Sequence, residues 1–239
     1  MLLHGGIECG GVYWAPVLAR LGQHHRLIVP DVPGLGESDP VDHLDSATFT
    51  DWMTALLRLR CAEPPILIAH SLLGTLAARF AANHGELLRQ LVIYAAPGVG
   101  PYRMPIGLRV VAIRFAVHPS EPNMERIERW AFADLDRVRR RDADWMHAFT
   151  AYTRGRASIP HVKRTMRQLV ATGTKQLNEH IDVPTTMVWG AQDRFVPVEL
   201  ARAASARLGW SLQVIDDAGH VPHIEQPDAF LEVITRTRS

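Results

Sequence analysis

The chain has 239 residues, of which 47% are hydrophobic and 21% are charged, and its formal net charge is +1. This length and composition are typical of a globular protein with a sizeable core, and so balanced a charge gives no electrostatic case for nucleic acid as a partner. No apolar run reaches the ~18 residues of a membrane span. The two cysteines, Cys9 and Cys61, provide neither metal-ligand spacing nor a disulfide framework. We therefore expect a cytoplasmic protein that uses no metal ion or cofactor.

The first 65 residues alternate between short apolar runs and helical patterns. Apolar residues recur at helical spacing in two places, and an aliphatic run between them predicts a buried strand. Pro33, Gly34 and Gly36 mark a turn after that run. In chain order, the predicted elements are the end of a strand at Leu2 and Leu3, a turn over residues 4–6, a helix over 14–21, a strand over 26–30, a turn over 31–38 and a helix over 49–59.

A serine stands at the junction of a strand and a helix. Pro65 to Ala69 is a short apolar run of the β type, and an apolar helical pattern continues from Ser71 to Ala82. A sharp turn between such elements holds a serine hydroxyl clear of a parallel sheet and points the first N–H groups of the helix at one place. A serine that opens a helix can equally be an ordinary N-cap. The serine alone does not decide between a nucleophile and a cap.

Strands and helices go on alternating after this helix. Such alternation predicts an α/β fold with a mostly parallel sheet flanked by helices. The further predicted elements are strands over 91–94, 185–189 and 212–215 and helices over 198–208 and 228–235.

One long segment interrupts the alternation. Between residues 98 and 182 the pattern predicts helices without a strand, among them 124–135, 142–154 and 162–169. We therefore expect a core made of residues 1–97 and 183–239, with residues 98–182 inserted as a helical cap.

Five short motifs resemble those of the α/β-hydrolase family. They are His4-Gly5-Gly6, residues 31–38 (DVPGLGES), residues 69–74 (AHSLLG), residues 189–197 (WGAQDRFVP) and residues 219–227 (GHVPHIEQP). The order serine, acid, histidine is the one that this fold uses. The resemblance implies the α/β-hydrolase fold with an inserted cap, and a serine hydrolase. It extends to esterases and to meta-cleavage-product hydrolases, which cleave carbon–carbon bonds.

The resemblance implies roles for three side chains and two backbone groups. Ser71 would be the nucleophile, His220 the base that takes its proton, and Asp193 the acid that orients the imidazole. The backbone N–H groups of Gly6 and Leu72 would form the oxyanion hole. Relatives that cleave epoxides or carbon–halogen bonds use an aspartate nucleophile, so a serine argues against both activities.

Other histidines and acids compete for these roles, and we rank them lower. His70 flanks the serine, but the alternation of a strand turns its side chain away. Asp216 and Asp217 end a strand and do not follow a glycine turn. Structural roles are expected for His4, His223 and Asp31.

Two features depart from the family pattern. Leu73 occupies a position that is normally small, so the turn or its packing partner has to differ. The family has two or three strands before the His-Gly loop, whereas only Met1 to Leu3 precede it here. We therefore expect a sheet without its leading strands, with residues 26–29 on an uncovered edge and a poorly anchored oxyanion loop. An uncovered edge invites a homodimer.

The predicted cap is basic. It carries 15 Lys and Arg against 9 Asp and Glu, a net charge of +6, and its densest cluster is Arg137, Arg139, Arg140 and Arg141. The cluster has two interpretations: a solvated helix face, or a surface that attracts an anionic substrate.

The motifs predict a serine hydrolase that cleaves a small carboxylic ester through an acyl-enzyme. An alternative from the same family is cleavage of a carbon–carbon bond in a dienoic or diketone acid, which a basic cap favours. Relatives of that kind often carry an aromatic residue directly after the catalytic histidine, whereas Val221 follows His220 here. An alternative of another class is a non-catalytic small-molecule-binding homologue. The acyl group, the leaving group and the residues that bind substrate stay open.

Overall fold

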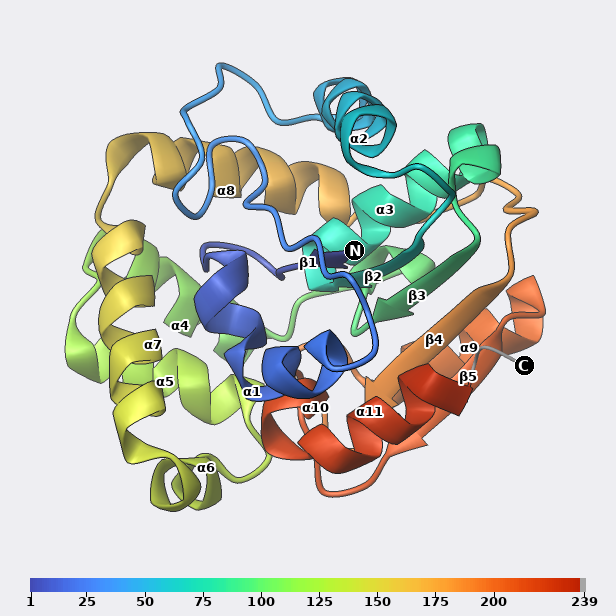
Figure 1. Ribbon diagram of the computed structural model, residues 1–239. Helices are drawn as coiled ribbons and strands as arrows, with labels where there is room; N and C mark the ends of the chain where they lie inside the picture. The colour runs from blue at the N-terminus through green and yellow to red at the C-terminus, as the bar shows by residue number, and fades with distance from the viewer. Residues whose placement is uncertain (237–239) are drawn as a thin grey trace.

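A parallel β-sheet lies at the centre of the computed structural model, which describes residues 1–236 (Figure 1). The five strands lie in the order β1-β2-β3-β4-β5, and each pair of neighbours is parallel. They are β1 (Leu2–Leu3), β2 (Ile66–His70), β3 (Gln90–Tyr94), β4 (Thr185–Gly190) and β5 (Ser211–Ile215). The α/β fold expected from the sequence is confirmed.

The middle strands are apolar along most of their length because both faces of the sheet are covered. All five residues of β3 are buried, as expected of a parallel strand between two layers of helices. The register pairs Ala69 with Ile93 and His70 with Tyr94. The carboxyl ends of β2 and β3 therefore reach the same edge of the sheet.

Six α-helices of residues 1–97 and 183–236 cover the two faces. They are α1 (Gly10–Gly22), α2 (Ser46–Arg60), α3 (Ser71–His84), α9 (Val198–Leu208), α10 (Pro222–Glu225) and α11 (Pro227–Arg236), and 3-10 turns lie at Gly85–Leu87 and Pro97–Val99. On one face α1 packs against β1, α10 and α11. On the other, α3 packs against β2 and β3, and α9 packs against β4 and β5. Figure 1 shows α2 lying outside α3.

Five α-helices lie between β3 and β4. They are α4 (Ile106–Val117), α5 (Glu121–Ala131), α6 (Leu135–Arg141), α7 (Ala143–Ala157) and α8 (Pro160–Gly173). In Figure 1 they gather on the left of the molecule, with α8 crossing toward α3, against which it packs. Residues 98–182 contain no strand, in line with the sequence pattern. That these helices form a cap stays a prediction.

The strand predicted over residues 26–30 is wrong. This segment runs beside β1 and is joined to it by a hydrogen bond from the N–H of Leu2 to the C=O of Ile28 at 2.9 Å. One backbone hydrogen bond does not make a ladder, so these residues form an extended segment rather than a strand. The edge of the described sheet is therefore β1.

The expectation of a poorly anchored oxyanion loop stays a prediction, although the strand before the loop is paired. The loop follows β1, whose residues pair with Ile68 and Ala69 of β2. The N-terminal ammonium group of Met1 donates to the C=O of Ile66 at 2.7 Å, and the N–H of Ile68 donates to the C=O of Met1 at 2.9 Å. These bonds fix the strand from which the loop departs.

Candidate active site

Ser71 lies on a sharp turn where β2 ends and α3 begins. Its φ angle is +51°, in the left-handed region that residues other than glycine rarely adopt. The helix crosses close to the strand end, because a Cβ on Gly74 would lie 3.1 Å from the carbonyl oxygen of Ala69. The close approach thus uses a glycine three residues after the serine, and Leu73 is buried in the core.

His220 reaches the serine from the loop after β5. Its Nε2 lies 3.0 Å from the Oγ of Ser71. Its backbone N–H donates to the C=O of Ala131 at 2.7 Å, and the ring of Phe195 stacks on the imidazole with centroids 4.7 Å apart. These contacts hold the ring with Nε2 toward the hydroxyl.

Asp193 joins the same chain of hydrogen bonds from the loop after β4. Its Oδ2 lies 2.9 Å from the Nδ1 of His220. Its Oδ1 accepts from the N–H groups of Phe195 and Val196 at 2.8 and 2.9 Å, and the carboxylate is buried. A fixed carboxylate at Nδ1 selects the tautomer whose Nε2 can accept the proton of Ser71.

His70 supports the loop that carries His220, here called the histidine loop. Its Nε2 donates to the C=O of His220 at 3.0 Å, and its Nδ1 accepts from the hydroxyl of Tyr13 at 2.5 Å. Burial lowers the pKa of His70 well below its ordinary value, and the charge of His220 lowers it further. The neutral ring is therefore a structural donor.

His223 and His4 also lie in structural environments. His223 lies with Nε2 3.2 Å from the C=O of Tyr13 and Nδ1 3.3 Å from the hydroxyl of Tyr94, and burial lowers its pKa to about 3. The Nε2 of His4 accepts from the N–H of Val32 at 3.2 Å, and burial lowers its pKa to about 4. Both rings stay neutral near pH 7 and bond to the protein's own framework.

The competing acids lie in turns. The carboxylate of Asp31 accepts from the N–H groups of Gly10 and Glu37 at 2.6 and 2.7 Å, which closes the turn after residue 30. Asp216 and Asp217 are exposed, and Asp217 has a φ of +52°. Neither contacts an imidazole through a hydrogen bond found among residues 1–236.

Gly6 and Leu72 belong to two elements that meet at the serine. The pairing of Leu3 with Ala69 places the loop after β1 beside the turn after β2. Leu72 is the second residue of α3, where N–H groups have no partner inside the helix. The loop after β1 and the first turn of α3 therefore lie side by side at the carboxyl edge of the sheet.

Glu8 is a neighbour of this loop that the sequence analysis missed. Its Oε2 is buried and has no hydrogen-bond partner within the described residues, and it lies 3.6 Å from where a Cβ on Gly6 would be. Burial raises the pKa of Glu8, while the N–H groups of Glu8 and Gly6 and the charge of His220 lower it. One carboxylate beside a glycine-rich turn is too weak a sequence signal to have singled it out.

The site geometry agrees with a comparison against known families. The chain matches the sequence model of the Alpha/beta hydrolase family over residues 1–233. The chain belongs to this family. The resemblance read from five motifs is thereby confirmed, and the protein is a hydrolase.

Similar proteins of this family include esterases and a dienoate hydrolase. A pimeloyl-[acyl-carrier protein] methyl ester esterase from Vibrio vulnificus is 26% identical over 234 residues, which cover 96% of this chain and 90% of that protein. The structure of a 2-hydroxy-6-oxo-6-phenylhexa-2,4-dienoate hydrolase from Rhodococcus sp. matches with a TM-score of 0.83 at 16% identity, covering 99% of this chain and 89% of the other. The structure of a thermophilic esterase from Thermogutta terrifontis matches with a TM-score of 0.76 at 21% identity, covering 100% of this chain and 89% of the other. The two structures show that the fold is shared.

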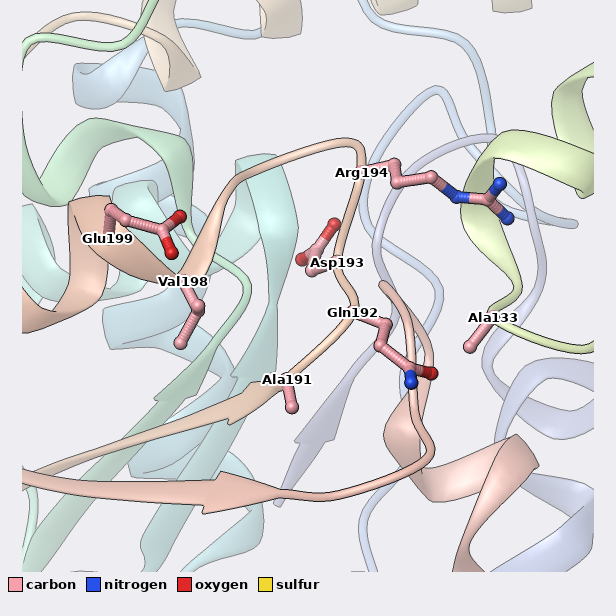
Figure 2. Close-up of a pocket in the computed structure, with 7 residues that line it drawn as sticks. All are labelled: Ala133, Ala191, Gln192, Asp193, Arg194, Val198 and Glu199. Atoms are coloured by element: carbon pink, nitrogen blue, oxygen red, sulfur yellow. The ribbon is translucent and has the colours of Figure 1, made fainter.

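A pocket of the hydrolase borders the loop that carries Asp193, here called the acid loop (Figure 2). Arg194 extends from this loop toward the segment that carries Ala133. Its guanidinium donates to the C=O groups of Arg129 and Phe132 at 2.6 and 2.5 Å. The residues that line the pocket are Ala133, Ala191, Gln192, Asp193, Arg194, Val198 and Glu199, so it does not reach the serine.

The arginine cluster ties the helical segment to the histidine loop. Arg137 and Arg141 donate to backbone carbonyls within residues 217–224, each at 2.5 Å. Arg139 pairs with the buried carboxylate of Glu128 at 3.1 Å. The three guanidinium groups thus bond within the protein although Arg141 is exposed, and the two interpretations drawn from the sequence stay open.

Proposed function

We propose that this hydrolase cleaves a carboxylic ester of a small molecule through an acyl-enzyme on Ser71. The observation that carries the proposal is the chain of hydrogen bonds from Ser71 through His220 to Asp193, at 3.0 and 2.9 Å. All three residues follow the carboxyl ends of parallel strands, where open α/β sheets bind their ligands. The positive φ of the serine supports a nucleophile rather than an ordinary helix cap.

The proposed reaction begins when the Oγ of Ser71 attacks the ester carbonyl carbon. His220 takes the serine proton as the new C–O bond forms, and the carbonyl oxygen becomes an oxyanion that accepts from the N–H groups of Gly6 and Leu72. Loss of one such donor costs about 3–4 kcal/mol of transition-state stabilisation. His220 then gives its proton to the departing alkoxide, which leaves as an alcohol. The acyl group stays on Ser71 as the acyl-enzyme.

Water completes the cycle. His220 takes a proton from a water molecule whose oxygen attacks the acyl carbon, and it returns that proton to the Oγ of Ser71 as the acid leaves. Asp193 keeps its charge throughout and stabilises the imidazolium. The balance is one ester and one water consumed for one acid and one alcohol.

We also propose that residues 98–182 act as the cap of this site. Met166 of α8 would lie 3.5 Å from a Cβ on Gly6, and the last residue of the same helix, Gly173, presses on Leu72. Ala131 at the end of α5 accepts from the backbone of the histidine loop. These contacts support a cap that touches both sides of the oxyanion site.

The second candidate is hydrolysis of a carbon–carbon bond in a dienoic acid. Its support is the structural match to a dienoate hydrolase. The basic cluster adds little to it, because Arg137, Arg139 and Arg141 are engaged within the protein. Val221 in place of an aromatic residue after His220 also favours the ester.

The test is a panel of p-nitrophenyl esters of increasing chain length beside one dienoate substrate. An ester hydrolase should release a burst of p-nitrophenol equal to the enzyme concentration, because acylation precedes a slower deacylation. Turnover of the dienoate alone would favour the second candidate. Binding without any turnover would identify the non-catalytic homologue.

Three variants test the assigned roles. Ser71→Ala and His220→Ala should each lower kcat by about 10⁵–10⁶-fold, and Asp193→Asn by about 10⁴-fold, because the three act as a unit. Asp217→Asn is the matched control, since asparagine tolerates the positive φ of that position. A large loss in the control with little loss in Asp193→Asn would show that the acid is misplaced.

A further inference from the structure

Helix α4 exposes a stripe of branched apolar side chains. Ile106, Val110, Ile113 and Val117 are 73%, 44%, 58% and 76% exposed. They follow the spacing i, i+4, i+7, i+11, so they lie within about 60° of one another around the helix. Among the described residues the only other exposed large hydrophobic side chain is Leu59, on α2.

An arginine flanks the stripe on each side. Arg109 and Arg114 are exposed and lie about 70° from its middle, in opposite directions. No carboxylate occurs in α4, and neither guanidinium pairs with one elsewhere in residues 1–236. A long arginine side chain can lay its methylene groups along apolar material while its charge stays at the polar boundary.

The stripe is not needed to hold the helix in place. Leu108 and Phe115 lie on the opposite side of α4 and are buried. The helix packs on α5, where Gly107 approaches Trp130 so closely that a Cβ would lie 2.8 Å from its ring. The outward stripe therefore contributes little to packing and leaves apolar surface in water, which is unfavourable for a monomer in solution.

We propose that α4 is a docking surface for an anionic lipid membrane. Four aliphatic side chains would enter the boundary between headgroups and acyl chains, and Arg109 and Arg114 would meet lipid phosphates on either side. The helix has 12 residues and would lie along the surface. No helix within residues 1–236 is long and apolar enough to cross a membrane.

Charge favours a lipid surface over a second copy of this chain. If two copies met through α4, the same stripe would face itself, and four arginines would surround one apolar patch. With no carboxylate on the helix to pair with them, these like charges would oppose association. An anionic membrane instead supplies negative charge along both edges of the stripe.

The test is co-sedimentation of the purified chain with vesicles of phosphatidylcholine alone or mixed with phosphatidylglycerol. We expect binding to the mixed vesicles, and high salt should weaken it. Arg109→Gln with Arg114→Gln should lower the partition coefficient about 25-fold, at about fivefold for each basic side chain. Ile106→Ser with Ile113→Ser should lower it at least tenfold, even on the mixed vesicles, through lost apolar burial.

Matched controls lie on α2. Arg58→Gln with Leu59→Ser removes an exposed arginine and an exposed apolar residue, and it should leave vesicle binding unchanged. Light scattering at rising protein concentration tests the alternative occupant. Three results would overturn the proposal: an equal loss of vesicle binding in the α2 control, no binding to either kind of vesicle, or a dimer in solution. The dimer would count if Ile106→Ser with Ile113→Ser converts it to a monomer. Arg109 and Arg114 are both exposed, so the result for the arginine pair stands if the serine pair unfolds.

Discussion

The carboxylate of Glu225 accepts a hydrogen bond from the backbone N–H of Gly219 at 2.6 Å, one residue before His220. Its other oxygen accepts from the N–H groups of Ala133 and Asp134 at 2.8 and 3.2 Å. The side chain is buried, so one carboxylate joins the histidine loop to the helical segment inside the protein. The position of the imidazole therefore depends on a residue that does not touch the serine.

Glu225→Ala should lower kcat by one to two orders of magnitude and leave KM much less affected. The change leaves three backbone N–H groups without an acceptor, at about 1–3 kcal/mol each when buried, so the free energy of unfolding should also fall. Glu225→Gln keeps one acceptor oxygen and should recover part of both losses. Ester turnover and urea denaturation measure the effects, with the exposed Glu63→Gln as control. A rise in KM with unchanged kcat would contradict a positioning role for Glu225.

Gly173→Ala should lower kcat by displacing the turn at the serine. A Cβ there would lie 2.9 Å from the carbonyl oxygen of Leu72 and 3.0 Å from its Cβ. Overpacking of this kind costs typically ~1–3 kcal/mol of stability, and here it moves the residue that carries a proposed oxyanion donor. Gly155→Ala in α7 is the matched control, since a Cβ there meets nothing within 4 Å. That control should keep full activity, and its free energy of unfolding should rise by about 0.5–1 kcal/mol. Equal kinetics for both variants would show that α8 does not set the turn.

Glu8→Gln should change the pH dependence of kcat/KM. Burial raises the pKa of Glu8, so the side chain is protonated at pH values where an ordinary glutamate is ionised. Above that raised pKa its charge would compete for the N–H of Gly6 and repel the developing oxyanion. The ratio of kcat/KM in Glu8→Gln to that of the unmodified protein should therefore be flat at low pH and rise with pH. If kcat/KM depends on pH in the same way in both proteins, Glu8 lies too far from the reacting oxygen to affect it.

Acid should destabilise the fold through its buried histidines. The folded-state pKa is about 4 for His4, about 3 for His223 and well below the ordinary value for His70. Below the unfolded value of ~6.5 the unfolded chain binds these protons and the folded chain does not, so the free energy of unfolding falls as pH falls. Each histidine contributes about 1.4 kcal/mol per pH unit inside its window. Buried carboxyls with raised pKa values, such as Glu225, act in the opposite direction.

Denaturation at pH values between 7.5 and 5 measures this slope. His223→Asn removes one of the three groups, so its stability should depend less steeply on pH, although it starts lower because two hydrogen bonds change. An unchanged slope in this variant would mean that His223 does not stay neutral in the folded protein.

Local signals were sufficient for most of the fold. The strands β2 to β5 lie within one residue or so of the runs that predicted them. For the inner strands β2 and β3 the reason is that a parallel strand buried on both faces is apolar at consecutive positions. The run over 26–30 is just as apolar, yet it forms no strand. A strand exists only where a neighbour supplies a ladder of hydrogen bonds, and this segment is joined to β1 by the bond from Leu2 to Ile28.

The candidate site divides in the same way. The strand–turn–helix pattern around Ser71 is local, and so are the loops that carry Asp193 and His220, which is why sequence motifs could point to them. Glu225 was not predicted, because two of its three N–H donors come from Ala133 and Asp134, far away in the chain. Glu8 was not predicted, because a single carboxylate beside a glycine-rich turn is a weak local signal. The hydrogen bonds of the arginine cluster were not predicted either, because the carbonyls that accept from Arg137 and Arg141 lie more than 75 residues away in the chain.

The sequence by itself determined the alternation of strands and helices, the strandless segment over 98–182 and the order of the serine, acid and histidine loops. These features depend on residue periodicity and on turns of a few residues. Only the tertiary structure decided which apolar run joins the sheet, which carboxylate stands behind the histidine loop and which helix face stays uncovered. Those outcomes depend on contacts between segments that are far apart in the chain. Such contacts set the burial, the hydrogen bonds and the pKa of each side chain.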